Sequence, residues 1–372
     1  MPFCLQKCLY CDFYSITDLN LIPDYLEALL AEITMCRRTG AIVDTIYFGG
    51  GTPSILPTRR IETIIARLHA CFAVDPAAEI TLEVNPGTAS QEKLAGYRSA
   101  GINRINIGLQ STDDLTLRWL GRIHTAKQGM DTIRIAQDSG FDNIGLDLIY
   151  GIPGQTQRQW QAELAAVAAL GVQHLSCYTL TLEPGTPLSV RVSNGSIPSP
   201  DEAVIGELFS LTGDFLSRNG YRQYEVSNFA HASISDSTDY RSRHNLKYWT
   251  FAPYQGFGPA AHSFMDKRRW WNLRSLGEYL GAVSAGKSPM AEMEVLSREQ
   301  QIMEYIYLSL RQTVGIDAID FESRFNMDFY QDREPELSRL VDEGLIEKSQ
   351  LGIRTTALGM RFLDRVVDRL IG

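Results

Sequence analysis

Hydrophobic residues in the first 230 positions follow two alternating patterns. In one set of segments they recur every three or four residues, as on one face of a helix, and in the other they form short runs that are typical of buried strands. The predicted strands are 44–48, 79–84, 104–109, 143–150, 174–182 and 221–226, and the main predicted helices are 23–38, 61–72, 126–138, 157–170 and 202–219. This alternation predicts right-handed βαβ units and a parallel sheet.

Four glycines mark the points where a predicted helix ends and a strand follows. Gly101, Gly140, Gly171 and Gly220 are each followed by an apolar residue, which is the usual arrangement at a helix end. Their unequal spacing argues against a solenoid of repeated units. The pattern is compatible with an open doubly wound sheet and with a complete or partial barrel. In both architectures, ligands bind at the carboxyl ends of the strands.

Polar residues occupy these strand ends. Gly49–Thr52 follow the first strand, and Glu83 and Asn85 lie at the end of the second. Gln110 follows the third strand, and Asp147 lies near the end of the fourth. Each of these residues alone is compatible with a tight turn, a solvated strand end or a paired core carboxylate. Together, at one edge of one sheet, they predict a site for a polar small molecule.

The pattern becomes mainly helical from Ser297 onward, with predicted helices at 299–310, 336–343 and 357–370 and a short hairpin-like segment after Gly344. This order is similar to a winged-helix arrangement, which often binds DNA. The segment carries ten basic and fourteen acidic residues, so it lacks the basic face that DNA binding requires. We therefore predict a structural or interaction domain here. The predicted division of the chain is 1–230, 231–296 and 297–372.

Composition narrows the class of protein. The chain has 372 residues, of which 44% are hydrophobic and 21% charged, as in an ordinary globular protein of about two domains. The net charge of −9 argues against a general nucleic-acid binder. No apolar run is long enough to span a membrane and no signal peptide precedes Cys4, so we expect a cytoplasmic protein.

Three of the six cysteines lie in one short loop, as Cys4, Cys8 and Cys11. Thiolates are the preferred ligands of iron–sulfur clusters. A four-iron cluster normally takes four cysteines, so three would leave one iron with an open coordination site. Two other interpretations fit the spacing: structural zinc with Asp12 or a distant histidine as fourth ligand, or three unrelated buried thiols. The other three, Cys36, Cys71 and Cys177, lie in apolar patterns and are predicted to be core residues.

Nucleotide-binding motifs are absent in their usual context. Gly49–Thr52 lacks the spacing of a phosphate loop, and the G-x-G-x-x-A match at Gly256–Ala261 follows an aromatic, proline-broken stretch instead of a strand. Neither supports a nucleotide site of these types.

The segment Tyr240–Arg274 combines seven basic residues with nine aromatic residues and only one acid, Asp266, in a chain that is acidic overall. Aromatic faces and cations suit a flat macrocycle with two propionates, and His244 or His262 could ligate its iron. A solvated basic face over a small aromatic core also explains the composition, and composition alone slightly favours it. Single-stranded nucleic acid would use the same residue types.

The cysteine motif with Tyr10, followed by Gly49–Pro53, resembles the radical S-adenosylmethionine (SAM) enzymes. In that family three cysteines hold a 4Fe–4S cluster whose open iron binds SAM, and reduction of the cluster cleaves SAM to a 5′-deoxyadenosyl radical. The resemblance is closer to the branch that includes the oxygen-independent coproporphyrinogen III oxidases. The motifs that carry it are Glu83–Pro86, Gly108–Ser111, Gly121–His124 and Asp147–Gly154.

The resemblance implies an α/β fold: a partial (β/α) radical-SAM barrel followed by a smaller, mainly helical, winged-helix-like domain. It also implies cluster ligation by Cys4, Cys8 and Cys11. The positions that would contact SAM are Tyr10, Gly50, Gly51, Thr52, Glu83, Gln110, Arg122 and Asp147. These roles are chemically reasonable, because glycines allow close backbone approach and arginine can bind a carboxylate with two hydrogen bonds.

Two features separate the chain from the oxidases. The oxidases carry a further cysteine two residues after the third, where this chain has Phe13, and they have a longer segment before the motif. Phe13 and His244–Trp249, which matches an HNxxYW motif, resemble the HemW-type haem chaperones. The first barrel strand of the family, with its tyrosine just upstream of the cysteines, is missing from this sequence. We expect either a start further upstream or a barrel that opens with a gap.

The resemblance to haem chaperones implies haem as cargo, with His244 as the candidate ligand, and delivery to apoproteins, including ones at the membrane surface. It is compatible with a homodimer and implies no nucleic-acid partner. Whether SAM is cleaved as part of the function stays open. The alternatives are an oxygen-independent coproporphyrinogen III oxidase, which decarboxylates its substrate with SAM, and a nucleic-acid-modifying radical-SAM enzyme.

Overall fold

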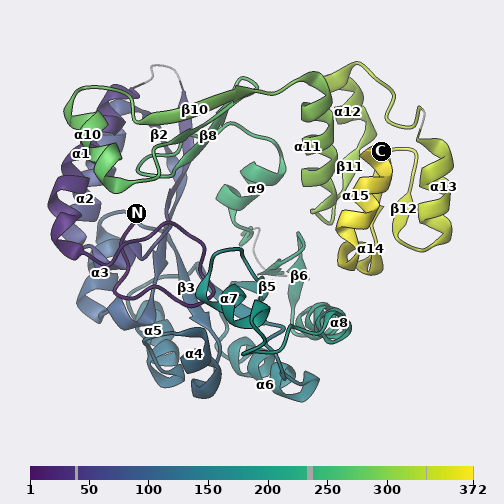
Figure 1. Ribbon diagram of the computed structural model, residues 1–372, viewed down its shortest axis with the longest axis horizontal. Coiled ribbons are helices and arrows are strands. Elements are labelled where there is room, and N and C mark those ends of the chain that lie inside the picture. Colours follow the sequence, from purple (N-terminus) through teal and green to yellow (C-terminus); the bar gives the residue numbers. More distant parts are fainter. Residues whose placement is uncertain (38–40, 233–237, 332, 372) are drawn as a thin grey trace.

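The computed structural model describes residues 1–37, 41–232, 238–331 and 333–371, and its central element is a seven-stranded sheet (Figure 1). β1 to β5 run parallel, whereas β7 runs antiparallel to both of its neighbours, β5 and β6. The strands are β1 (Ile42–Phe48), β2 (Ala73–Val84), β3 (Arg104–Gln110), β4 (Ile144–Tyr150), β5 (His174–Thr179), β6 (Tyr221–Gln223) and β7 (Asn228–His231), in the order β1-β2-β3-β4-β5-β7-β6. The predicted α/β class is confirmed.

Helices between the strands bury the outer face of this sheet in one continuous hydrophobic core. Helices α5 and α6 begin at capping boxes, in which a threonine and a glutamine three residues later bind each other's backbone N–H groups. None of the described helices is long and apolar enough to cross a lipid bilayer. The helices of this part are α1 (Ile22–Met35), α2 (Thr58–Cys71), α3 (Gln91–Ser99), α4 (Asp114–Leu120), α5 (Ala126–Asp138), α6 (Gln157–Ala168), α7 (Pro187–Ser193) and α8 (Glu202–Arg218).

The two faces of the parallel sheet differ in polarity. On β2, the side chains of Ile80 and Leu82 are buried against the outer helices, and those of Thr81 and Glu83 alternate with them on the inner face. The register aligns Glu83 with Asn106 of β3, so that both lie on the inner face. Parallel strands covered on both faces usually form continuous apolar runs. The alternation here shows that the sheet encloses a polar interior.

The structure differs from the predicted elements at the end of the sheet. The predicted strand 221–226 is only the short β6, and β7, which was not predicted, lies between it and β5. The predicted strand 174–182 ends at Thr179. The last predicted helix, 357–370, is interrupted at Phe362, whose φ of −113° and ψ of 36° are not helical. Residue 38, the last of the first predicted helix, lies outside the described residues.

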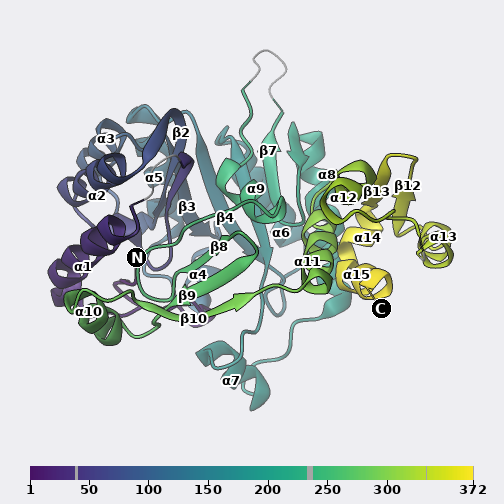
Figure 2. The same ribbon diagram turned by 90° about the horizontal axis from the view of Figure 1, so that it is seen from above.

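The chain after β7 forms a second, smaller layer. Helix α9 (Arg243–Trp249) packs against β1, and a three-stranded antiparallel sheet follows in the order β10-β9-β8 (Figure 2). Helix α10 packs on α1, so this layer is attached to the barrel edge at both ends. Its remaining elements are β8 (His262–Met265), β9 (Arg268–Asn272), α10 (Leu276–Ser284) and β10 (Met290–Val295).

The C-terminal part has its own hydrophobic core, built around aromatic rings in edge-to-face contact such as Phe321 and Phe329. A small antiparallel sheet in the order β11-β13-β12 lies among its helices, as the winged-helix resemblance implies. The elements are α11 (Arg298–Leu310), β11 (Ile316–Asp317), α12 (Ala318–Phe325), α13 (Glu334–Asp342), β12 (Ile346–Lys348), β13 (Gly352–Thr355), α14 (Ala357–Arg361) and α15 (Leu363–Ile371). The predicted division into three domains stays a prediction.

Candidate functional site

The three cysteines of the N-terminal motif lie in one compact loop at the carboxyl end of the sheet. The Cys4 N–H donates to the Ile16 carbonyl at 2.9 Å, and the Cys11 N–H donates to the Cys8 carbonyl at 3.3 Å. Leu9, between the motif cysteines, donates to the Leu120 carbonyl at 3.3 Å. The loop is thereby attached to α4, and all three thiols are free and half-buried.

The glycine loop after β1 lies directly against the segment that carries the cysteines. The N–H groups of Gly51 and Thr52 donate to the carbonyls of Met1 and Phe3, both at 2.7 Å. A Cβ atom at Gly51 would lie 2.6 Å from the Phe3 carbonyl oxygen, so only glycine fits there. The Thr52 hydroxyl donates to the Cys4 thiol at 3.5 Å. In this structure the close approach that the glycines permit is to the cysteine segment.

Arg122 connects the cysteine loop to the end of β3. Its Nη1 donates to the Cys8 thiol at 3.5 Å and its Nη2 donates to the Gly108 carbonyl at 2.7 Å. Its buried Nε has no partner among the described residues. Gln110 follows with a φ of 67°, where the register between β3 and β4 is broken. The Tyr10 ring is beside Arg122, and burial raises the pKa of its hydroxyl while the guanidinium opposes this shift.

Two carboxylates extend this set across the inner face. Glu83 accepts from the Tyr47 hydroxyl at 2.9 Å and from the Gly50 N–H at 3.1 Å. Asp147 accepts from Asn106 Nδ2 at 2.7 Å through one oxygen, and its other oxygen is buried without a partner among the described residues. Burial raises the pKa of both carboxyls, that of Glu83 to about 7, where the charge of Asp147 adds to the effect.

The donor set fits an iron–sulfur cluster. Burial raises the pKa of the Cys11 thiol, and the charges of Cys8 and Cys4 in the same loop add to this effect. Among the described residues, no three His, Cys, Asp or Glu side chains form a group that could hold a metal ion on its own. In a four-iron cluster each thiolate binds a different iron, so thiols spread around one loop suit it.

Family models match both ends of the chain. A model described as the radical SAM superfamily matches residues 1–166, and one described as the HemN C-terminal domain matches residues 296–362. The heme chaperone HemW of Lactococcus lactis is 31% identical over 372 residues, covering 100% of this chain and 96% of that protein. The heme chaperone HemW of Bacillus subtilis is 30% identical over 377 residues, covering 100% and 98%. The chain belongs to the heme chaperone HemW family.

A solved structure supports the fold assigned to this HemW-family chain. The coproporphyrinogen III oxidase HemN from Escherichia coli, a radical SAM enzyme, matches with a TM-score of 0.84 at 24% identity, covering 100% of this chain and 88% of that chain. At this level of identity the likeness concerns the fold alone. The predicted radical-SAM α/β fold with a helical C-terminal domain is confirmed.

The basic residues of the aromatic segment are mostly paired inside this HemW-family chain. Arg241 pairs with Asp239 at 2.6 Å, and Lys247 pairs with Asp44 at 2.7 Å. Arg243 lies 4.0 Å from the same Asp44, and Arg269 binds Glu294 and Glu304. Among the described residues, only Lys267, Arg268 and Arg274 of the seven cations have no ion pair. Arg241, Arg243 and Lys247 therefore already have acidic partners in this structure.

His244 lies on the same face of α9 as Tyr248, as the spacing of the motif predicts. Its Nε2 is 3.0 Å from the Tyr248 hydroxyl and its Nδ1 is 2.9 Å from the Thr45 hydroxyl. The imidazole stacks on the Tyr47 ring at 4.8 Å. Burial lowers the pKa of His244 to about 4, and the charge of Lys247 adds to this effect. His262, in contrast, is exposed and stacks on Trp271.

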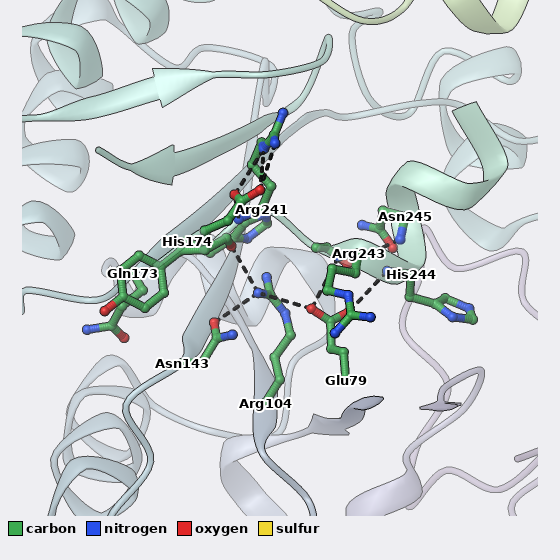
Figure 3. Close-up of polar contacts among 12 residues, drawn as sticks. Glu79, Arg104, Asn143, Gln173, His174, Arg241, Arg243, His244 and Asn245 are labelled. Atoms are coloured by element: carbon green, nitrogen blue, oxygen red, sulfur yellow. Dashed lines mark hydrogen bonds and ion pairs between the residues drawn. The ribbon is translucent and has the colours of Figure 1, made fainter. Parts of the chain in front are cut away.

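A buried polar network that the sequence did not reveal holds α9 in place (Figure 3). Glu79 of β2 accepts from the N–H groups of Arg243 and His244 at 3.2 and 3.0 Å and lies 3.9 Å from the buried Arg104. Arg104 also donates to the side chain of Asn143 at 2.9 Å. The only sequence signal was the alternation of polar residues on the inner face of the strands, which indicates a polar interior without identifying its partners.

Proposed function

We propose that the chain is a radical-SAM haem chaperone that binds a 4Fe–4S cluster, SAM and haem and delivers haem to apoproteins. Cys4, Cys8 and Cys11 are the proposed cluster ligands. The proposed SAM contacts are Tyr10, Gly50, Gly51, Thr52, Glu83, Gln110, Arg122 and Asp147. The observation that carries the proposal is the similarity to heme chaperone HemW proteins over the full length of the chain.

The chemistry of the SAM side supports this assignment. SAM carries a carboxylate, an ammonium group and ribose hydroxyls. The unpartnered Arg122 Nε is a cationic donor for a carboxylate, and the unpartnered Asp147 Oδ1 is an acceptor for a hydroxyl or an ammonium group. A cluster bound at the three cysteines would supply an electron to SAM. The protein residues would hold both groups in place, next to the hydrophobic cluster around Leu188 against which Leu9 and Tyr10 pack.

Haem is proposed to bind on the layer that follows β7, with His244 as its iron ligand. For this, His244 Nε2 must exchange the Tyr248 hydroxyl for the metal, whereas Nδ1 can keep its contact with Thr45. Lys267, Arg268 and Arg274, which form no ion pair within the part of the chain that the structure describes, are the proposed partners of the propionates. The same proposal includes apoproteins as clients, some of them at the membrane surface. It also includes a homodimer and a location in the cytoplasm.

One experiment tests the whole assignment. The chain is purified anaerobically, reconstituted with iron and sulfide, and examined by visible spectroscopy before and after addition of haem. We expect about four irons per chain, a SAM-dependent change in the reduced spectrum and a Soret band for bound haem. Turnover of coproporphyrinogen III to protoporphyrinogen with SAM and a reductant would overturn the chaperone proposal. It would favour the oxidase, although Phe13 replaces the extra cysteine of those enzymes.

A further inference from the structure

Tyr47 lies between two residues that the sequence assigned to separate ligands. Its hydroxyl donates to Glu83 Oε1 at 2.9 Å, and its ring stacks on His244 at a centroid distance of 4.8 Å and an interplanar angle of 21°. Glu83 belongs to the proposed SAM contacts and His244 is the proposed haem ligand. One aromatic side chain of β1 therefore connects the two sites directly.

Helix α9 is held firmly where it meets Tyr47. Glu79 accepts two N–H groups of its first turn, and Arg243 Nη1 donates to the Ala77 carbonyl at 2.7 Å. Thr45 holds the His244 ring through Nδ1, and Lys247 pairs with Asp44. Figure 3 shows the His244 ring pointing away from the Glu79–Arg104 network, so this network fixes the backbone of His244 and leaves its ring against β1. A displacement of the ring must therefore be passed on to Tyr47.

The position of the Glu83 carboxylate depends on Tyr47. The carboxylate has two hydrogen-bond donors among the described residues, the Tyr47 hydroxyl and the Gly50 N–H. A Cβ atom at Gly49 would lie 2.7 Å from Tyr47 Cε1 and 3.0 Å from Glu83 Oε1. This tight packing restricts the side chains of Tyr47 and Glu83 to one relative arrangement. Burial raises the pKa of Glu83 to about 7, so the hydrogen bond from Tyr47 also helps to keep the group ionised.

We propose that Tyr47 is a positioning residue: it holds the Glu83 carboxylate in place and transmits to it the position of the His244 ring. The HNxxYW helix then acts on the SAM pocket as well as on haem. Haem ligation, which moves His244 away from Tyr248, changes SAM affinity, and by linkage SAM changes haem affinity by the same factor. This inference rests on the proposed function, because it takes SAM as the ligand at Glu83.

The test is a mutant cycle on SAM affinity, measured in the absence of haem with the cluster-loaded chain. Tyr47→Phe keeps the ring but removes the hydrogen bond to a charged group, so we expect SAM affinity to fall about tenfold with unchanged iron content. His244→Ala, which removes the stacked ring, should lower it less. The double variant should bind SAM as Tyr47→Phe does, because both changes act through one contact. Gly49→Ala is a second variant, expected to disturb the same pair by crowding.

The controls separate this inference from the proposed function. Tyr305→Phe removes a hydroxyl that binds Asp320 in the C-terminal part, and His262→Ala removes a histidine from β8, so neither should change SAM affinity. Tyr47→Phe with wild-type SAM affinity, or losses that simply add in the double variant, would overturn the role of Tyr47 while the chaperone proposal stands. A wild-type chain that loads its cluster but binds no SAM would overturn the proposed function itself.

Discussion

The SAM side and the haem side of the molecule were both inferred from sequence motifs, yet several of their proposed ligand-binding groups differ in whether they already have partners. On the SAM side, Arg122 Nε and Asp147 Oδ1 are buried without partners among the described residues. On the haem side, both ring nitrogens of His244 have partners, and Lys247 is paired with Asp44. Buried polar groups cost free energy unless they form hydrogen bonds. The SAM side therefore leaves two buried polar atoms for a ligand to satisfy, whereas His244 and Lys247 of α9 already have partners, and on this helix Trp249 Nε1 is a buried atom without one among the described residues.

The largest expected effect is on the cluster. Replacing Cys4, Cys8 or Cys11 by Ser should abolish the iron content and the broad visible absorption of the reconstituted chain, because each thiolate is proposed to be the sole protein ligand of one iron. Cys36→Ser and Cys71→Ser are matched controls, since both thiols lie in or next to outer helices. Equal losses in these controls would show that the cluster is not at the N-terminal loop.

The second expected effect tests the proposed SAM pocket. Arg122→Ala should lower SAM affinity by about ten- to a hundredfold, because the guanidinium is the cationic donor proposed for the SAM carboxylate. Iron content should be retained, because Arg122 contacts the Cys8 thiol only through Nη1 and is not a ligand. Arg118→Ala, on the last turn of the neighbouring α4, is the control. Wild-type SAM affinity in the Arg122 variant, measured by calorimetry, would refute the assigned pocket.

The fold, and the position of polar residues at one edge of the sheet, could be predicted because their signals are local. Alternating apolar patterns predicted the parallel strands. Polar residues at strand ends, such as Glu83 and Asp147, must then lie at the carboxyl edge of the sheet because of its topology. The inserted strand β7 and the docking of α9 depend on contacts between distant segments, for example Glu79 with His244. Tyr47 lies within an apolar run and resembled a core residue. Periodicity gives no information about such pairings.

The third effect tests whether the haem side is more than a packed helix. His244→Ala should lower haem affinity about tenfold and shift the Soret band, with His262→Ala as the matched control. Tyr248→Phe removes the hydroxyl that occupies His244 Nε2, so haem affinity should stay equal or rise if this nitrogen binds the iron. A loss of affinity in the His262 variant alone would assign the iron to His262 and leave His244 a structural residue.

The smallest expected effect concerns the stability that His244 provides. Its pKa is about 4 in the folded chain and about 6.5 in an unfolded one, so folding favours the neutral ring. The stability that depends on this ring is fully present above pH 6.5 and is lost as the pH falls towards 4. Urea unfolding at pH 7.5 and 4.5 should therefore show that the advantage of the wild type over His244→Ala is smaller at the lower pH. The His69→Ala variant, which changes an exposed histidine on α2, should show no such change.

An advantage that stays constant with pH would mean that the His244 ring is not held neutral between Thr45 and Tyr248. The haem side would then be as open to a ligand as the SAM side, and the contrast between them would disappear.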